Sequence, residues 1–129
     1  MDKILAVIIG GGTGALLRYL ASGFVQNRTD SFFPWGTFAV NVSGCFIMGV
    51  LWNLFENVPV SPAVRIFFIT GILGGYTTFS SFGIETINLM RDGETARALA
   101  NILLSNALGI AAVFAGIFLS RVILGAFKS

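Results

Sequence analysis

A group of helix breakers, hydroxyls and aromatic rings lies inside the third apolar stretch of the chain, where a lipid-spanning helix normally carries leucine. The segment reads Gly74-Gly75-Tyr76-Thr77-Thr78-Phe79-Ser80-Ser81-Phe82. Each glycine weakens a helix by about 1 kcal/mol relative to alanine, and non-helical backbone at membrane depth persists only within protein or beside a water-filled cavity. We therefore predict a broken helix with a binding or conduction element at the break.

Polar residues of this stretch share one face if the helix is continuous. They are Thr77, Ser81, Glu85 and Asn88. Side chains at these spacings lie close to one helical face, with Phe79 and Phe82 on a neighbouring face. Ring edges carry partial positive charge and hydroxyls donate hydrogen bonds, so this mixture suits a small anion. In the alternative interpretation, the hydroxyls bond to their own helix and the rings face lipid.

Three further polar side chains inside apolar stretches need partners. The amide of Asn41 can donate to an ion, and Arg18 lies near enough to the end of its stretch to reach an aqueous vestibule and attract anions. A purely structural, snorkelling arginine is the alternative for Arg18. Glu85 is either a paired interfacial carboxylate or a gate at a pore mouth. The fourth stretch raises the same question with Asn101, Ser105 and Asn106, which hydrogen bonds between helices could explain.

The composition indicates a membrane protein. Hydrophobic residues make up 55% of the 129 residues and charged residues 11%, and the mean hydropathy is +0.85. Three stretches without charge exceed the roughly 18 residues of a spanning helix, and the first reaches this length if it contains Arg18. We predict one all-α membrane domain over residues 1–129, with Ser61 and Pro62 capping the third helix. Its four helices cover roughly 4–25, 36–55, 63–90 with a break near 74–79, and 95–124.

Basic residues divide almost evenly between the two sides of such a bundle. One side has Lys3, Arg65, Arg121 and Lys128, and the other has Arg28, Arg91 and Arg97. Orientation follows an excess of Lys and Arg in cytoplasmic loops, so this balance is compatible with insertion in both orientations as an antiparallel dimer. A single orientation set by other details stays equally open. The net charge of +2 is small and dispersed, and we expect no nucleic-acid partner.

Small residues recur at four-residue spacing on two of the predicted helices. The motifs are Gly10-xxx-Gly14, Ser105-xxx-Gly109 and Ala112-xxx-Gly116. Such spacing allows helix backbones to approach closely. It predicts helix packing and, with less weight, oligomerisation.

Three motifs, taken in order, carry a resemblance to a known family. They are Gly10-xxx-Gly14-xxx-Arg18, Gly36-Thr37-xxx-Asn41 and Gly71-xx-Gly74-Gly75-x-Thr77-Thr78-Phe79-Ser80-Ser81-Phe82. In these positions the chain resembles the Fluc/CrcB family of fluoride channels, and the third motif is the most specific. The family has threonine where Ser81 stands, which keeps a hydroxyl. Asn101 occupies a place where some members have an aromatic residue or histidine.

The resemblance implies a site and an assembly that the residues alone do not establish. It implies an antiparallel, dual-topology homodimer with two pores, each lined by both subunits. Phe79 and Phe82 would edge the fluoride path, Asn41 would donate to the ion, and Arg18 would attract fluoride at the vestibule. Ser105 would line the path from the fourth helix, and a polar track would continue along Thr77, Ser81 and Glu85.

The resemblance also implies a structural sodium ion and a cellular role. The sodium would lie on the two-fold axis, bound by main-chain carbonyls of Gly74 and Thr77 from both chains. Freed carbonyl oxygens are hard ligands that suit a hard cation, so the helix break and the sodium are compatible. The expected function is passive export of fluoride from the cytoplasm across the cell inner membrane, which reduces fluoride toxicity.

Two other classes of membrane protein remain as alternatives. A small proton-coupled drug exporter also has four helices, but it needs a carboxylate deep in a helix, commonly the first, where this chain has only Arg18. A structural subunit without transport activity would use the break and the hydroxyls for packing. An enzyme is disfavoured, because the chain has no histidine and a single cysteine, Cys45, in the second stretch.

Overall fold

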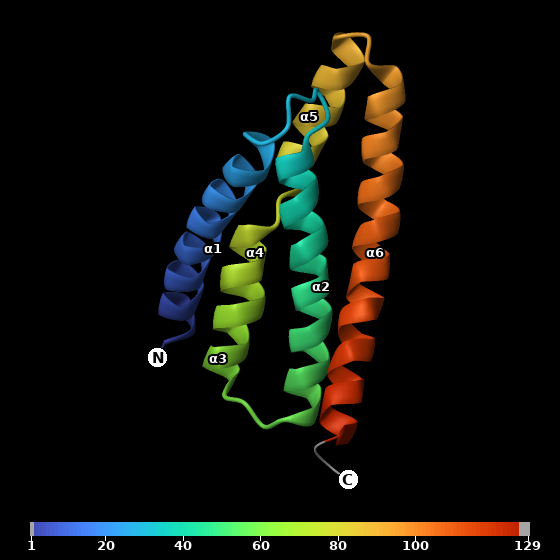
Figure 1. The fold of residues 1–129 in the computed structure, drawn as a ribbon. Helices are drawn as coiled ribbons and strands as arrows, with labels where there is room; N and C mark the ends of the chain where they lie inside the picture. Colours follow the sequence, from blue (N-terminus) through green and yellow to red (C-terminus); the bar gives the residue numbers. More distant parts are fainter. Residues whose placement is uncertain (1, 127–129) are drawn as a thin grey trace.

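Helices make up almost all of the fold. The computed structural model describes residues 2–126, and over that range it contains no strand. In chain order the elements are α1 (Lys3–Gln26), α2 (Trp35–Asn57), α3 (Pro62–Ile66), the π-helix η1 (Phe67–Leu73), α4 (Gly74–Tyr76), α5 (Phe79–Arg91) and α6 (Thr95–Ala126). The elements from α3 to α5 follow one another along a single span (Figure 1).

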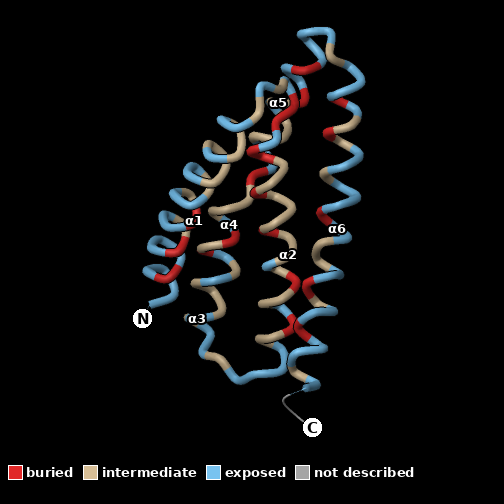
Figure 2. The backbone as a smooth tube through the Cα atoms, in the orientation of Figure 1, coloured by how far each residue is buried: buried red, intermediate tan, exposed pale blue. Residues whose placement is uncertain are grey.

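Four helical spans are long and apolar enough to cross a membrane, which confirms the predicted number. They are Lys3–Gln26, Trp35–Asn57, Pro62–Arg91 and Thr95–Ala126. Both ends of the described chain lie toward the same end of the bundle (Figure 1). Buried residues form narrow seams where helices meet, and the outer faces of α1 and α6 are exposed (Figure 2). These apolar faces therefore need lipid or another protein surface to cover them.

Glycines bring two pairs of helices into close contact. A Cβ atom on Gly10 of α1 would lie 2.7 Å from the carbonyl oxygen of Phe67 in η1, and one on Gly116 of α6 would lie 2.9 Å from the amide nitrogen of Val50 in α2. Close packing is thus confirmed for Gly10-xxx-Gly14 and for Gly116, whereas a Cβ atom on Gly109 would make only an ordinary contact, 3.6 Å from Cys45 Sγ. These contacts join helices of the same chain, so the oligomerisation inferred from the motifs has to rest on other features.

The α1–η1 contact gives a direct test of this packing. A Cβ atom on Gly14 would collide with the backbone of Ile72, whereas one on Gly12 would meet no atom within 4 Å. We expect Gly14→Ala to lower the free energy of unfolding in detergent by about 1–3 kcal/mol, the usual cost of overpacking. The matched variant Gly12→Ala should not lower it, and the higher helix propensity of alanine should raise it by up to about 1 kcal/mol. Equal effects of the two substitutions would show that α1 does not pack on η1 as described.

The start of the third span has the predicted cap. Ser61 Oγ accepts a hydrogen bond from the amide of Val64 at 3.3 Å, and Pro62 is the first residue of α3. This arrangement satisfies an amide group that has no partner within the helix. The sequence signal for this helix end was therefore correct.

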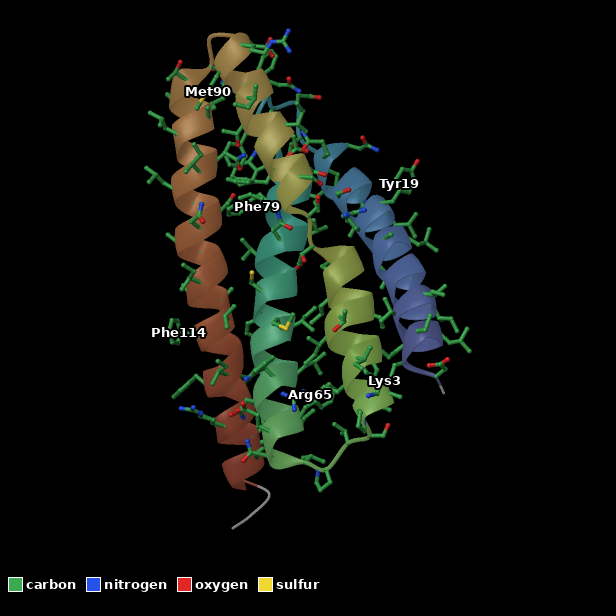
Figure 3. The ribbon with its side chains drawn as sticks, turned by 180° about the vertical axis from the view of Figure 1, so that it is seen from behind. Lys3, Tyr19, Arg65, Phe79, Met90 and Phe114 are labelled. Carbon is green, nitrogen blue, oxygen red and sulfur yellow. The ribbon has the colours of Figure 1, made fainter. Side chains whose placement is uncertain are left out.

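Basic residues are present at both ends of the bundle. Lys3 and Arg65 lie at one end (Figure 3), and the guanidinium carbon of Arg65 is 5.1 Å from the ring centre of Trp52. At the other end, Arg28 and Arg97 each lie over a phenylalanine ring. Such cation–π pairs orient arginines at membrane interfaces. Lys128, which belongs to the predicted distribution, lies outside the described residues.

Candidate functional site

The third span is interrupted at Thr77 and Thr78. α4 ends at Tyr76 and α5 begins at Phe79, and both threonines have extended backbone, with ψ angles of 154° and 114°. Gly74 has helical dihedral angles, so the glycines are not the point of interruption. Gly75 instead allows a close contact, since a Cβ atom there would lie 2.5 Å from the carbonyl oxygen of Gly11 in α1.

Asn41 of α2 stabilises the interrupted backbone. Its Nδ2 atom donates to the carbonyl oxygen of Thr78 at 2.9 Å, and its Oδ1 atom accepts from the amide of Thr78 at 2.7 Å. These two bonds satisfy both backbone polar groups of a residue that is outside any helix. A primary amide has two N–H donors, so Asn41 keeps one N–H for another partner.

Thr78 begins the helix that follows the break. Its Oγ1 atom accepts from the amide of Ser81 at 3.1 Å and lies 3.0 Å from Ser81 Oγ, to which it donates. A hydroxyl that accepts from the third amide of a helix is a typical N-cap. Sequence reasoning did not assign this role to Thr78, although threonine directly before a helix is a common N-cap signal.

A cavity of about 300 Å³ lies beside the break, between α2 and α6. It brings together five residues that the sequence singled out: Asn41, Thr77, Phe79, Phe82 and Ser105. Asn106 and Cys45 also line it. Amide, hydroxyl and aromatic groups from all three long elements around the break therefore meet in one place.

The two phenylalanine rings lie next to each other at the start of α5. Their centres are 5.3 Å apart and their planes are inclined by 42°. Phe79 lies about midway along the bundle (Figure 3), and 81% of its surface is exposed in the single chain. The cavity is thus open on the side of Phe79, and the site is not enclosed by one chain alone.

Glu85 lines a different cavity, of about 440 Å³, toward the far end of α5. Thr37 Oγ1 donates to Glu85 Oε1 at 2.6 Å. The second carboxylate oxygen, Oε2, is buried without a hydrogen-bond partner among residues 2–126. Asn88 lines the same cavity. The carboxylate is therefore separated from the cavity of the two rings.

The predicted polar stripe is interrupted by the break. Ser81, Glu85 and Asn88 belong to α5, whereas Thr77 precedes it, so the regular helical spacing does not extend to Thr77. The Thr77 hydroxyl donates to the carbonyl oxygen of Leu73 at 3.0 Å. Arg18 is half-buried on α1 and lines neither of the two cavities.

The break frees the two carbonyl groups that were expected to bind sodium. In a continuous helix, the carbonyl oxygens of Gly74 and Thr77 would accept from the amides of Thr78 and Ser81. Those amides donate instead to Asn41 Oδ1 and Thr78 Oγ1. Gly74 is also exposed. These oxygens are suitable ligands for a hard cation, and one chain supplies two of the several oxygens such an ion needs.

Similar proteins identify the family of this chain. Residues 5–117 match the family model described as CrcB-like protein, Camphor Resistance (CrcB). The chain is 47% identical over 122 residues to a protein of Desulforapulum autotrophicum, covering 94% of this chain and 98% of that protein. It is 44% identical over 128 residues to one of Parabacteroides distasonis, covering 99% and 100%.

Both relatives carry the name fluoride-specific ion channel FluC. A third relative with this name, from Rhizobium meliloti, is 46% identical over 122 residues, covering 94% of this chain and 98% of that protein. The matched residues include at least part of each of the four membrane spans and all residues that line the cavity beside the break. This chain belongs to the CrcB family.

Proposed function

We propose that this chain forms a passive, fluoride-selective channel that exports fluoride from the cytoplasm and so reduces fluoride toxicity. The observation that carries the proposal is the break at Thr77 and Thr78, which opens beside a cavity that combines two phenylalanine rings with amide and hydroxyl groups. The names of the relatives support fluoride as the ion. Ion channels are not enzymes, and no group of three or more His, Cys, Asp or Glu side chains in residues 2–126 is placed to hold a metal ion.

The cavity offers a fluoride ion weak donors in place of water. The edges of Phe79 and Phe82 carry partial positive charge. Asn41 has one uncommitted N–H, because its other N–H is bonded to Thr78. Thr77 and Ser105 also have hydroxyl groups at the cavity wall, and each can donate to the ion only when its hydrogen leaves its present acceptor, Leu73 O or Asn101 Oδ1. Several weak donors favour conduction, since an ion has to leave as readily as it enters.

Groups outside this cavity extend the path. Ser81 and Glu85 continue the polar surface along α5 toward the second cavity, where the Glu85 carboxylate bonds to Thr37. Arg18 supplies a positive charge on α1 that attracts anions to the vestibule. Both roles follow from the resemblance to the family and are part of the proposal.

A second copy of the chain, inserted in the opposite orientation, completes the site. Phe79 is 81% exposed in one chain, and the cavity beside it is open. An antiparallel homodimer would cover these rings and would contain two pores, each lined by both subunits. The near-even distribution of basic residues at the two ends of the bundle supports insertion in both orientations.

A sodium ion at the axis of this dimer would stabilise the pair of breaks. The freed carbonyl oxygens of Gly74 and Thr77 fit a hard cation, and two chains would supply four such oxygens. Oxygens of this kind are costly at membrane depth unless a partner satisfies them. The proposed sodium therefore has a structural role.

Passive transport is sufficient for export across the cell inner membrane. A potential of about 100 mV, negative inside, contributes roughly 2.3 kcal/mol to the exit of a monovalent anion. Because 1.36 kcal/mol corresponds to a factor of ten, this potential can keep the fluoride concentration outside the cell roughly fifty times higher than inside. The chain has no histidine to relay protons, and no coupled ion is required.

Fluoride efflux from proteoliposomes tests the proposal. Vesicles that contain the purified protein and potassium fluoride are diluted into fluoride-free buffer with valinomycin, and external fluoride is recorded. We expect rapid fluoride release and no chloride release from matched vesicles loaded with potassium chloride. Release of both anions would contradict selectivity. Absence of fluoride release from folded protein would contradict the channel and leave two interpretations, a structural subunit or a small drug exporter.

A further inference from the structure

A buried chain of hydrogen bonds connects α6 to α5 behind the candidate pore. Ser105 Oγ donates to Asn101 Oδ1 at 3.1 Å, and Asn101 Nδ2 donates to Thr86 Oγ1 at 2.9 Å. Thr86 Oγ1 in turn donates to the carbonyl oxygen of Phe82 at 2.7 Å. Asn101 is 1% exposed and Thr86 5%. The two ends of this chain, Ser105 and Phe82, both line the cavity beside the break.

The chemistry of the groups fixes the direction of every hydrogen in this chain. A carbonyl oxygen only accepts, so Thr86 uses its single hydroxyl hydrogen on the oxygen of Phe82. Thr86 therefore accepts from Asn101, which requires the NH2 group of the amide to face Thr86. The amide oxygen of Asn101 then faces Ser105. Because a carbonyl oxygen has no hydrogen, the Ser105 hydroxyl is the donor of this bond.

We infer that Asn101 is a positioning residue that weakens anion binding at Ser105 by holding the hydroxyl hydrogen of Ser105. The inference rests on the proposed function, in which Ser105 lines the fluoride path. A hydroxyl has one hydrogen, so Ser105 cannot donate to Asn101 and to an anion at the same time. While the bond to Asn101 persists, the cavity side of Ser105 presents lone pairs, which repel an anion.

Asn101 therefore sets how tightly an anion binds at Ser105. When an anion takes the Ser105 hydrogen, Asn101 Oδ1 is left buried and unpaired, and this opposes binding. Weak binding at this site speeds the departure of the ion, which conduction requires. A residue that only held α5 and α6 together would need its bond to Thr86 and no other. Asn101 also accepts a bond from Ser105, and this second bond is the one that reaches the ion path.

Removal of the amide oxygen tests this role. In Asn101→Leu, the Ser105 hydrogen is free for an anion, so we expect the half-saturating fluoride concentration for flux to fall about tenfold, the effect of a hydrogen bond of ordinary strength. The maximal flux should fall as well, because the ion leaves more slowly. Asn101→Ala removes the same acceptor with a smaller side chain and should shift the half-saturating concentration in the same direction, which covers the case in which leucine does not fit.

Two comparisons separate this role from a structural one. The shift caused by Asn101→Leu should disappear when Ser105 is alanine, because no hydrogen remains to be released. Thr86→Ser, which removes a buried methyl group but keeps the hydroxyl that orients the Asn101 amide, should reduce thermal stability without changing the half-saturating concentration. A shift that persists in Ser105→Ala, or one that Thr86→Ser reproduces, would overturn the inference.

Fluoride binding provides a readout that does not depend on transport. Sodium fluoride should raise the thermal unfolding temperature of the detergent-solubilised protein relative to sodium chloride, and the Asn101→Leu protein should reach half of this effect at about tenfold less fluoride. Tighter binding in that variant without flux in the wild type would support the inference and overturn the channel. Equal binding by the two proteins, or no stabilisation of either by fluoride, would overturn the inference.

Discussion

Replacement of Phe79 or Phe82 by isoleucine is expected to reduce fluoride flux by about 100-fold or more while the protein remains folded. Hydrogen bonds to charged groups contribute about 1.5–3 kcal/mol, and we expect the loss of a ring edge from the ion path to be of similar size; 2.7 kcal/mol corresponds to a factor of about 100. Isoleucine fills a similar apolar space but has no ring edge with partial positive charge. The measurement is fluoride efflux from proteoliposomes at equal protein density, with circular dichroism to verify helix content.

A matched control is available on α6. Phe114 is 69% exposed and is not among the residues that line the cavity, and its side chain lies on the outer side of α6 (Figure 3). Phe114→Ile should retain wild-type flux. If Phe79→Ile and Phe82→Ile also retained it, the rings would serve packing only, as in a structural subunit. A loss of flux in all three variants would point to a general sensitivity to apolar substitutions.

Replacement of Asn41 by alanine is expected to abolish fluoride flux and to destabilise the protein. The substitution leaves both the amide and the carbonyl group of Thr78 without their partner. Each buried, unpaired backbone group costs about 1–3 kcal/mol. It also removes the N–H that we assign to the ion. We expect a decrease of about 2–6 kcal/mol in the free energy of unfolding in detergent, together with efflux at the level of empty vesicles.

Asn57 provides the comparison for this prediction. It also lies on α2, but its amide donates to the carbonyl oxygen of Asn53 within the same helix, at 2.8 Å. Asn57→Ala should therefore change stability by less than about 1 kcal/mol and leave flux unaltered. Asn41→Asp keeps one of the two bonds to Thr78, because a carboxylate can still accept from the Thr78 amide, but it loses the bond to the Thr78 carbonyl oxygen and cannot donate to fluoride. Wild-type flux in Asn41→Asp would contradict donation by Asn41.

The four spans could be predicted because their signal is local. Long uncharged stretches and a Ser61-Pro62 cap need only neighbouring residues to be recognised. The break in the third span could not be explained from neighbouring residues alone. The sequence predicted a break near 74–79 and attributed it to the paired glycines. The chain leaves the helix inside that range, at Thr77 and Thr78, but the bonds that hold the break come from Asn41, 37 positions away from Thr78. No periodicity in one segment contains that information.

Helix register explains the other differences. The stripe that includes Thr77 and Glu85 assumes a continuous helix, and α5 starts a new one at Phe79. The small-residue motifs correctly predicted close packing, but a motif does not identify its partner, and Gly10 and Gly116 pack against helices of their own chain. Asn101 stood out as a buried amide, while its partner Thr86 was not singled out because threonine in a helix commonly bonds to its own backbone, as this one also does.

The extended pair Thr77 and Thr78 has a consequence for how this span can vary. In a continuous helix, insertion of one residue rotates every later side chain by about 100°. Here α5 has its own cap in Thr78 and its own anchor in Asn41, so its orientation does not depend on the register of η1 and α4. The π-helix is itself a place where an extra residue per turn is accommodated. Insertions and deletions before the break can therefore remodel the packing half of the span while the half that carries Phe82 keeps its orientation.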